Sequence, residues 1–308
     1  MGALVADAAS LGCHWIYDVA RLADIAEAND GRTAFTPIDA ENYAEVQAYF
    51  AHGQRSDGML TQYGETLRLT NRSMIEHGGK FECEDYQKDY AEVFGPGGTY
   101  RGYIDAATAG TLKNISNDVL DPSGIDDHQH PAITRLPAIA LAYGGDEDFN
   151  DQVETAIRVT NLHKEALSYG LLFAQMLNRV LEGAEINEAM DLAAEDATGD
   201  AKRLLHDALS ATEQNSIAYG ETTGRACYLN MGMPLMFHIL KQTNSFEEAI
   251  EANNLAGGDN AGRAIMIGAL MGARHGIAGE AGIPLSWILR THDADEIWHE
   301  CLTLAEIT

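Results

Sequence analysis

Asp259 is a carboxylate in a position where it could do chemistry. In the stretch "NLAGGDNAGRAIMIGALMGARHG" it follows two glycines and precedes an apolar run that carries Gly268, Gly272 and Gly276. Glycines four residues apart share one helix face and allow a second backbone to approach closely. Asp259 could be a plain N-cap that accepts from free backbone N–H groups. The tight packing also favours a carboxylate held rigidly at a buried reaction site.

A second acid, Asp7, lies among small residues in "GALVADAASLGCHWIYD" and is followed by His14, Trp15 and Tyr17. An ionised carboxylate is buried only when neighbouring groups compensate its charge. Asp7 could simply bond to an adjacent helix, but two small-residue helices that each carry an acid indicate a shared polar centre. The aromatic rings could stack on a base or sugar, or could pack in the core.

Polar residues also gather ahead of two further helices. "SDGMLTQYGETLRL" places Thr61, Gln62, Tyr63 and Glu65 at the start of an amphipathic segment, either as ordinary capping residues or as part of a site.

"GIDDHQHPAITRLPAIALAYG" presents Asp126, Asp127, His128 and His130 before a proline. A His-x-His pair with adjacent acids could bind a metal, although a solvated loop is the common alternative. His163 in "RVTNLHKEAL" is expected to pack or to cap a helix.

Helices must position these residues. Apolar residues recur at intervals of three and four through most of the chain, while alternating β-branched runs are nearly absent. The pattern predicts roughly a dozen helices, with Asn244 or Ser245 capping one of them. No linker or repeat divides the chain, so we expect one all-α domain over residues 1–308.

Composition excludes some partners. Twenty Lys and Arg residues face 47 Asp and Glu residues, a formal charge of −27, which disfavours nucleic acid and anionic membrane. The four cysteines are widely spaced, as in a reduced cytoplasmic protein. The longest apolar run is too short to span a bilayer.

Taken together, the motifs resemble those of the ADP-ribosylglycohydrolase superfamily, more closely the branch that contains the jellyfish J-type crystallins. The matching stretches are "GALVADAASLGCHWIYD", "LTQYGETLRL", "HPAITRLPAIALAYG", "VTNLHKEAL", "GGDNAGRAIMIGALMGARHG" and "GIPLSWI", in the family's order. The resemblance implies an all-α orthogonal multi-helix bundle with a central cleft. In the family's hydrolases two magnesium ions sit in that cleft, held by an early Thr-Asp-Asp loop and a late Gly-Gly-Asp-x-Asp-Thr loop, where the bond between ADP-ribose and a side chain or second ribose is cleaved.

The sequence departs from the family's metal pattern. Asp259 matches the first acid of the late loop, but Ala261 and Gly262 stand where the second acid and the threonine are expected. "TQYGE" replaces the early loop and leaves Glu65 as its nearest acid, while His14 stands where many family hydrolases carry an acid. Two magnesium ions are therefore not expected; one ion held by Glu65 and Asp259, or none, is the prediction.

Three functional hypotheses remain. The first is a hydrolase of a glycosidic bond to ADP-ribose or a related nucleotide-sugar, acting on a small molecule or an ADP-ribosylated substrate, with no prediction of oligomeric state. The second is a catalytically inactive, crystallin-like protein. The third is a His-Asp metallo-phosphohydrolase that uses His292 and Asp293 with His128 and His130.

In the first hypothesis Arg263 pairs a phosphate, and in the second it bridges internally to Asp7 or Asp259. The candidate catalytic residues are Asp7, His14, Glu65 and Asp259, and the candidate substrate-binding residues are Trp15, Tyr17, Tyr63, Asp127, His128, Asn260 and Arg263.

Overall fold

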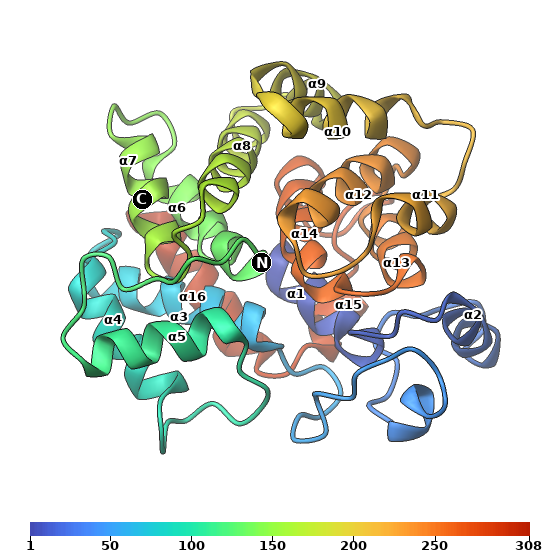
Figure 1. The fold of residues 1–308 in the computed structure, drawn as a ribbon, viewed down its shortest axis with the longest axis horizontal. Helices are drawn as coiled ribbons and strands as arrows, with labels where there is room; N and C mark the ends of the chain where they lie inside the picture. The colour runs from blue at the N-terminus through green and yellow to red at the C-terminus, as the bar shows by residue number, and fades with distance from the viewer.

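The computed structural model describes residues 1–308 and is built from sixteen α-helices and three short 3₁₀ helices (Figure 1). Extended structure is limited to isolated bridges such as the one between Ile16 and Ala48. The all-α prediction is confirmed, and the helices are shorter and more numerous than expected. They are α1 (Gly2–Ser10), α2 (Val19–Ala28), α3 (Gln62–Glu76), α4 (Cys83–Phe94), α5 (Ala106–Ser116), α6 (Leu136–Tyr143), α7 (Phe149–Arg158), α8 (Lys164–Leu181), α9 (Ile186–Asp196), α10 (Gly199–Ser210), α11 (Ser216–Thr223), α12 (Leu229–Gln242), α13 (Phe246–Ala256), α14 (Asn260–His275), α15 (Leu285–Arg290) and α16 (Ala294–Ile307), with 3₁₀ helices at Leu11–Cys13, Ala40–Tyr43 and His130–Ile133.

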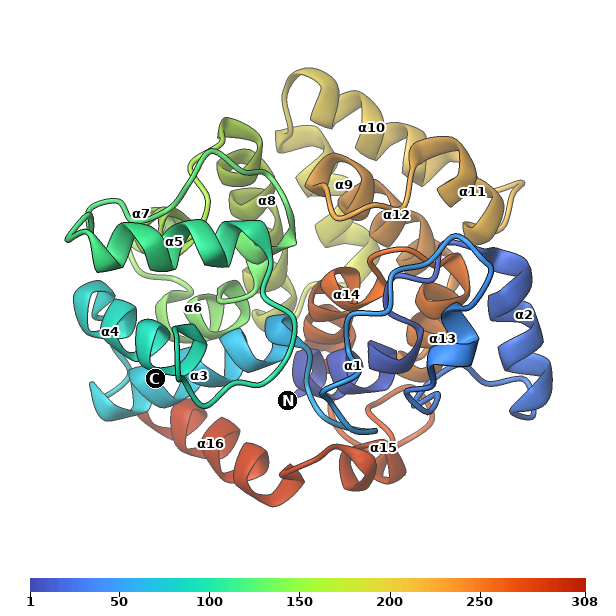
Figure 2. The same cartoon turned by 60° about the horizontal axis from the view of Figure 1, so that its bottom comes forward.

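Helices α1 and α14 pack along one another at the middle of the molecule (Figures 1 and 2). A methyl group on Gly2 would collide with the carbonyl oxygen of Gly268, and one on Gly268 would lie 2.5 Å from the Cβ of Ala6. The predicted close approach at Gly268 and Gly272 is therefore confirmed. Gly276 has a different role: it ends α14 with φ +66°, and a side chain added there would meet no neighbouring atom.

The remaining helices surround this pair. Figure 1 shows α3 to α8 on one side and α11 to α13 on the other, with α9 and α10 beside α8 and α12. Helix α16 lies against α3 along one edge in Figure 2. Buried apolar side chains run continuously from Leu4 in α1 to Leu304 in α16, and a smaller group around Leu22 lies under α2. The assignment of the chain to one domain stays a prediction.

Side chains begin several helices where the sequence predicts. Ser245 accepts the N–H of Glu248 at the start of α13, and His163 accepts the N–H of Glu165 at the start of α8. Thr61 caps α3 in the same way, and so does Asp105 at α5, a residue that the sequence analysis does not single out. These caps satisfy backbone groups that a helix leaves free at its first turn.

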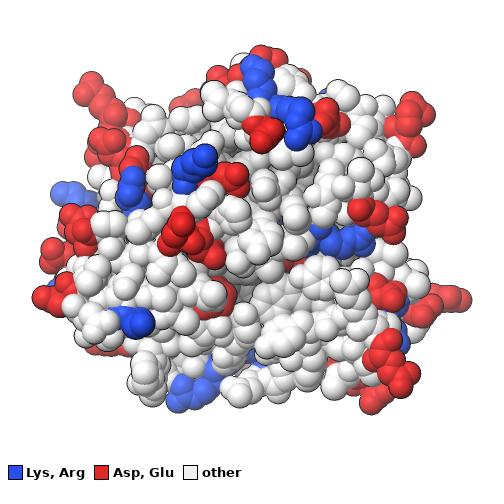
Figure 3. All heavy atoms as spheres, viewed as in Figure 1, with Lys and Arg blue, Asp and Glu red and all other residues white.

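Acidic side chains are spread over the surface, and red outnumbers blue on the face shown in Figure 3. No helix is both long enough and apolar enough to cross a membrane.

Candidate functional site

Asp259 lies at the N-terminus of α14 and is completely buried. Its Oδ1 accepts from Nε2 of His14 at 2.9 Å and from the N–H of Gly262 at 3.0 Å. Its Oδ2 accepts from Nδ1 of His130 at 2.7 Å and from the hydroxyl of Tyr63 at 3.0 Å. A carboxylate offers about four lone-pair sites. All of them are therefore filled from within the protein.

These donors decide the charge of Asp259. Burial acts to raise the pKa of Asp259, but His130 and His14 outweigh it and hold the pKa well below its usual range. The positive end of α14 acts in the same direction. Asp259 is therefore ionised at neutral pH.

A second histidine extends the network from His14. Nδ1 of His14 lies 2.7 Å from Nε2 of His52, and Nδ1 of His52 has no partner. Burial lowers the pKa of His14 and lowers that of His52 well below its usual value, so both rings are neutral at pH 7. The network then assigns one set of protons: His52 Nε2–H donates to His14, and His14 Nε2–H donates to Asp259.

Two glycines make room for His130. A side chain at Gly262 or at Gly232 would collide with the imidazole ring, which is fully buried. Arg135, also fully buried, donates to the carbonyl of Pro131 at 3.1 Å and so holds the turn that carries the ring.

Asp7 meets the same turn of α3 as Asp259. The N–H and hydroxyl of Thr61 donate to Asp7 at 2.7 Å and 2.6 Å, and the Thr61 hydroxyl also accepts from the N–H of Tyr63. Burial raises the pKa of Asp7 to about 7, although the bonds from Thr61 act to lower it. Gly64 leaves the space in which the Asp7 carboxyl lies.

A small cavity opens beside this network in place of the expected cleft. Its volume of about 10 Å³ suits a single water molecule. Burial raises the pKa of Asp105, one of the lining residues, to about 6, and Asp105 accepts from the Gln62 amide at 2.7 Å. The cavity is lined by His14, Trp15, His52, Thr61, Gln62, Tyr63, Tyr103 and Asp105.

Trp15 and Tyr17 lie at the edge of this centre. The indole N–H of Trp15 points to the sulfur of Cys227 at 3.3 Å, and its ring lies edge-to-face with Tyr103 at 4.8 Å. Tyr17 is half-buried. Trp15 is therefore placed to contact a molecule in the cavity.

The residues do not fit the two-magnesium centre that the resemblance implies. Magnesium requires about six oxygen ligands. Asp259 has no free lone pair, the Thr61 hydroxyl is bonded to Asp7, and Ala261 and Gly262 offer no side-chain oxygen. The predicted ligand Glu65 is paired with Arg55. The geometry gives no basis for a magnesium site made by Glu65 and Asp259.

Two residues predicted to bind substrate are part of the scaffold. The amide of Asn260 donates to the carbonyl of Ser10 at 3.1 Å and to Asn254 at 2.7 Å, which ties α14 to α1. The predicted bridge from Arg263 to Asp7 or Asp259 is wrong. Arg263 donates to the Asn253 side chain at 2.9 Å and to the carbonyl of Gly257 at 2.6 Å.

Burial lowers the pKa of Arg263 to about 10, and the guanidinium stays charged at neutral pH. The Arg263 side chain is completely buried. Its bond to the carbonyl of Gly257 fixes the turn that precedes Asp259, because breaking that bond would leave a buried carbonyl without a donor.

Asp127 and His128 belong to a different group. Asp127 accepts from the side chain of Asn161 at 2.8 Å, and Nδ1 of His128 lies 3.0 Å from Glu165. The His128/His130 pair of the sequence is thus divided, since His130 points to Asp259.

The His-Asp phosphohydrolase hypothesis fails on geometry. His292 and Asp293 are 2.9 Å apart on the surface, but Asp293 is held by Arg68, and no third metal-ligating side chain joins them. The exposed pair is a surface contact.

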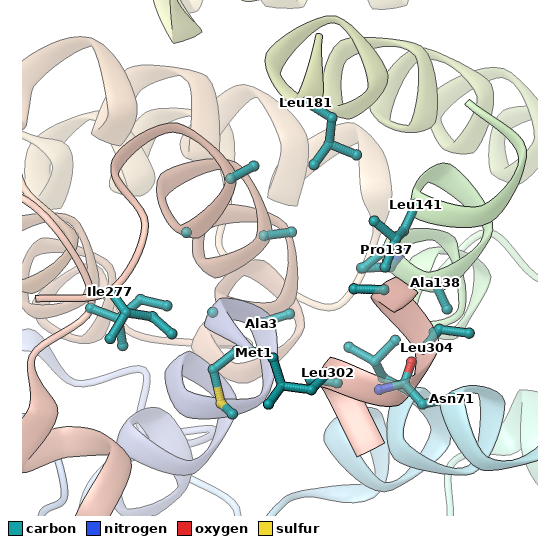
Figure 4. A pocket seen from close by; sticks show the side chains of 18 of the residues that line it. Met1, Ala3, Asn71, Pro137, Ala138, Leu141, Leu181, Ile277, Leu302 and Leu304 are labelled. Carbon is teal, nitrogen blue, oxygen red and sulfur yellow. The ribbon is translucent and has the colours of Figure 1, made fainter. Parts of the chain in front are cut away.

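A much larger cavity, about 380 Å³, lies elsewhere and is apolar (Figure 4). Side chains of α1, α6, α8 and α16 line it, and Asn71 is its one polar side chain. On α14 it touches Ala269, Gly272 and Ala273, near the helix end opposite Asp259. It offers no acid or base and is no candidate for hydrolysis.

Sequence reasoning missed His52 and Asp105 and assigned His130 to a different role. The loop "FAHGQRSDG" gives His52 no recognisable spacing. Asp105 could have been noticed, because an Asp before "AATAG" is typical of a helix N-cap.

Comparison with known proteins agrees with this fold. A family model described as ADP-ribosylglycohydrolase matches residues 1–307. Crystallin J1A from Tripedalia cystophora is 24% identical over 96% of this chain and 92% of its own length, and crystallin J1B from the same animal is 23% identical over the same shares. A solved structure titled ADP-ribosylglycohydrolase-related protein complex matches with a TM-score of 0.72 at 18% identity, over 99% of this chain and 96% of the other.

Proposed function

The chain belongs to the ADP-ribosylglycohydrolase family, and from this premise we propose that it hydrolyses a glycosidic bond to ADP-ribose or a related nucleotide-sugar without magnesium. One observation carries the proposal. The hydrogen-bonded series Asp259–His14–His52 ends at Nδ1 of His52, which has no hydrogen-bond partner. His52 and Asp105 both line the water-sized cavity.

His52 supplies the base in this proposal. Its neutral ring keeps the lone pair of Nδ1 free for the proton of a water molecule in the cavity. As His52 takes up that proton it becomes a cation, and Asp259 stabilises the positive charge through His14. A buried carboxylate that orients a histidine has this role in catalytic triads.

Asp105 supplies the acid. Burial raises the pKa of Asp105 to about 6, so a fraction of the carboxyl is protonated near neutral pH and can protonate a leaving oxygen or nitrogen. Trp15 and Tyr103, which line the cavity, stack on the base or sugar. The cavity of about 10 Å³ holds a water molecule and no sugar, so the residues that line it must move apart for a substrate to enter.

The test measures release of ADP-ribose from ADP-ribosylated arginine and serine substrates, with magnesium and with EDTA. We expect turnover that EDTA leaves unchanged and that falls roughly 10²- to 10⁴-fold in His52→Ala and in Asp105→Asn. His299→Ala, at an exposed histidine, is the matched control and should keep full activity. Turnover that requires magnesium would contradict the proposal.

A specific observation favours a second function, that of a non-catalytic, crystallin-like protein. The filled lone pairs of Asp259 and the water-sized cavity leave the centre closed. On this alternative, no substrate turns over and ADP-ribose produces no shift in melting temperature, since a ligand that binds the native state must stabilise it.

A further inference from the structure

Three metal-ligating side chains that the proposed hydrolysis does not use lie together at the start of α8. His128 comes from the loop before the 3₁₀ helix His130–Ile133, His163 is the N-cap of α8, and Glu165 is in its first turn. One nitrogen or oxygen of each lies within 4.8 Å of those of the other two. No other group of three such side chains occurs in the molecule.

Two atoms of this cluster lie close together without a well-directed hydrogen bond. Nδ1 of His128 and Oε2 of Glu165 are 3.0 Å apart and shielded from solvent, but neither makes a hydrogen bond of good geometry with the other or with any other group. A buried polar atom whose hydrogen bond is missing or badly directed destabilises the fold. A cation bound between the two atoms would satisfy both.

We propose that His128, His163 and Glu165 bind one divalent transition-metal ion of the Zn²⁺ or Co²⁺ class. Two histidines and one glutamate form a known three-ligand set for zinc, with the fourth position left for water. Bond lengths of about 2.1 Å place tetrahedral ligands roughly 3.4 Å apart, so small side-chain rotations complete the site. Imidazole nitrogens suit zinc, cobalt and nickel, and they disfavour magnesium.

The surroundings hold the cluster while leaving it open. The ring of His128 lies edge-to-face with His163 at 4.6 Å and with Tyr228 at 4.8 Å. The side chains of His128 and Glu165 are 29% and 36% exposed, so an ion can reach them. If Nε2 of His163 binds the metal ion, the ring proton must lie on Nδ1. Nδ1 can then no longer accept the 3.2 Å hydrogen bond from the Glu165 N–H, and the loss of this bond lowers the affinity for the ion.

The experiment is a titration of the EDTA-treated full chain with Co²⁺, followed by displacement with Zn²⁺. We expect one Co²⁺ per chain, visible absorption bands typical of four-coordinate cobalt, and no competition from magnesium. His128→Ala and Glu165→Gln should each weaken binding by roughly tenfold or more. The absorbance readout does not depend on hydrolysis, so this proposal stands or fails separately from the proposed function.

His163→Asn separates ligation from folding. Asparagine is a good N-cap, so the metal-free variant should melt close to wild type while it loses the cobalt bands. His206→Ala is the matched control, since it removes a surface histidine that lies 3.3 Å from Glu195. Absence of stoichiometric binding would overturn the proposal, as would binding that survives His128→Ala and His163→Asn.

Discussion

At the scale of single residues, the centre is governed by a carboxylate whose bonding capacity is used up inside the protein. Four donors surround Asp259, two of them on imidazole rings. The closest functional parallel is a third member of a catalytic triad, which orients a histidine and does not itself react. His14 and His52 thereby become the groups that face the cavity.

Asp259→Asn tests this arrangement. The amide group of asparagine would point an N–H at a donor that Asp259 now accepts from, so two buried donors would face each other without an acceptor. We therefore expect the free energy of unfolding to fall by about 3 to 5 kcal/mol. Urea denaturation at pH 7 measures it. Asp18→Asn, at the half-buried N-cap of α2, is the control and should change stability little, because asparagine caps as well as aspartate. Equal effects of the two substitutions would contradict the role given to Asp259.

Asp7 makes a prediction about pH. Its folded pKa of about 7 lies above its ordinary value of 3.8, so its favourable contribution is complete below pH 3.8 and lost as pH rises through 7. The stability of wild type minus that of Asp7→Asn should therefore fall between pH 4 and pH 8. Denaturation of both proteins at several pH values measures the difference. Asp151→Asn, at an exposed position, should give no such trend; a flat difference for Asp7 would show that its pKa is not raised.

The residues of the centre were predictable to the extent that helix packing and motif order constrain them. Asp259, His14 and Tyr63 were all predicted from the sequence, and the structure places them in contact. His52 was not, because it reaches the centre from an irregular segment whose path no periodicity records. The sequence predicts the wrong partner for Arg263, because a carboxylate is the simplest partner for a buried guanidinium, whereas the structure pairs it with the Asn253 side chain and the carbonyl of Gly257.

At the scale of helices, the small residues of α1 and α14 allow the two helices to pack closely, with Asp7 and Asp259 buried between their neighbours. The glycine spacing correctly predicts the close contact between α1 and α14, because a side chain at Gly2 or Gly268 would collide with atoms of the other helix. The sequence predicts fewer helices than the structure contains, because short helices such as α11 and α15 have too few turns to show a clear apolar periodicity.

Gly268→Ala probes that contact. The new methyl group would lie 2.5 Å from the Cβ of Ala6, and overpacking of this kind costs about 1 to 3 kcal/mol. Thermal unfolding measures it. Gly220→Ala in α11 is the matched control, since its methyl group would meet only flexible side chains, Leu235 at 3.3 Å and Arg225 at 3.8 Å, and alanine has the higher helix propensity. An unchanged melting temperature in Gly268→Ala would rule out the close packing.

At the scale of the whole molecule, the formal charge of −27 is the dominant surface property. Like charges repel across the folded surface and oppose compaction. Raising the salt from about 0.1 M to 1 M shortens the screening length from about 10 Å to about 3 Å. We therefore expect the melting temperature to rise by a few degrees. KCl and NaCl should act equally; a decrease, or an effect of one cation alone, would argue against simple screening.

The presence of His130 beside Gly262 bears on how such a centre can change over generations. A side chain at position 262, such as the threonine that the resemblance implies for the family's metal-binding loop, would overlap the His130 ring. Threonine is thus forbidden until the imidazole is gone, while loss of the imidazole alone strips a donor from Asp259. A threonine at position 262 and an imidazole at position 130 therefore exclude one another, so these two positions can change only together.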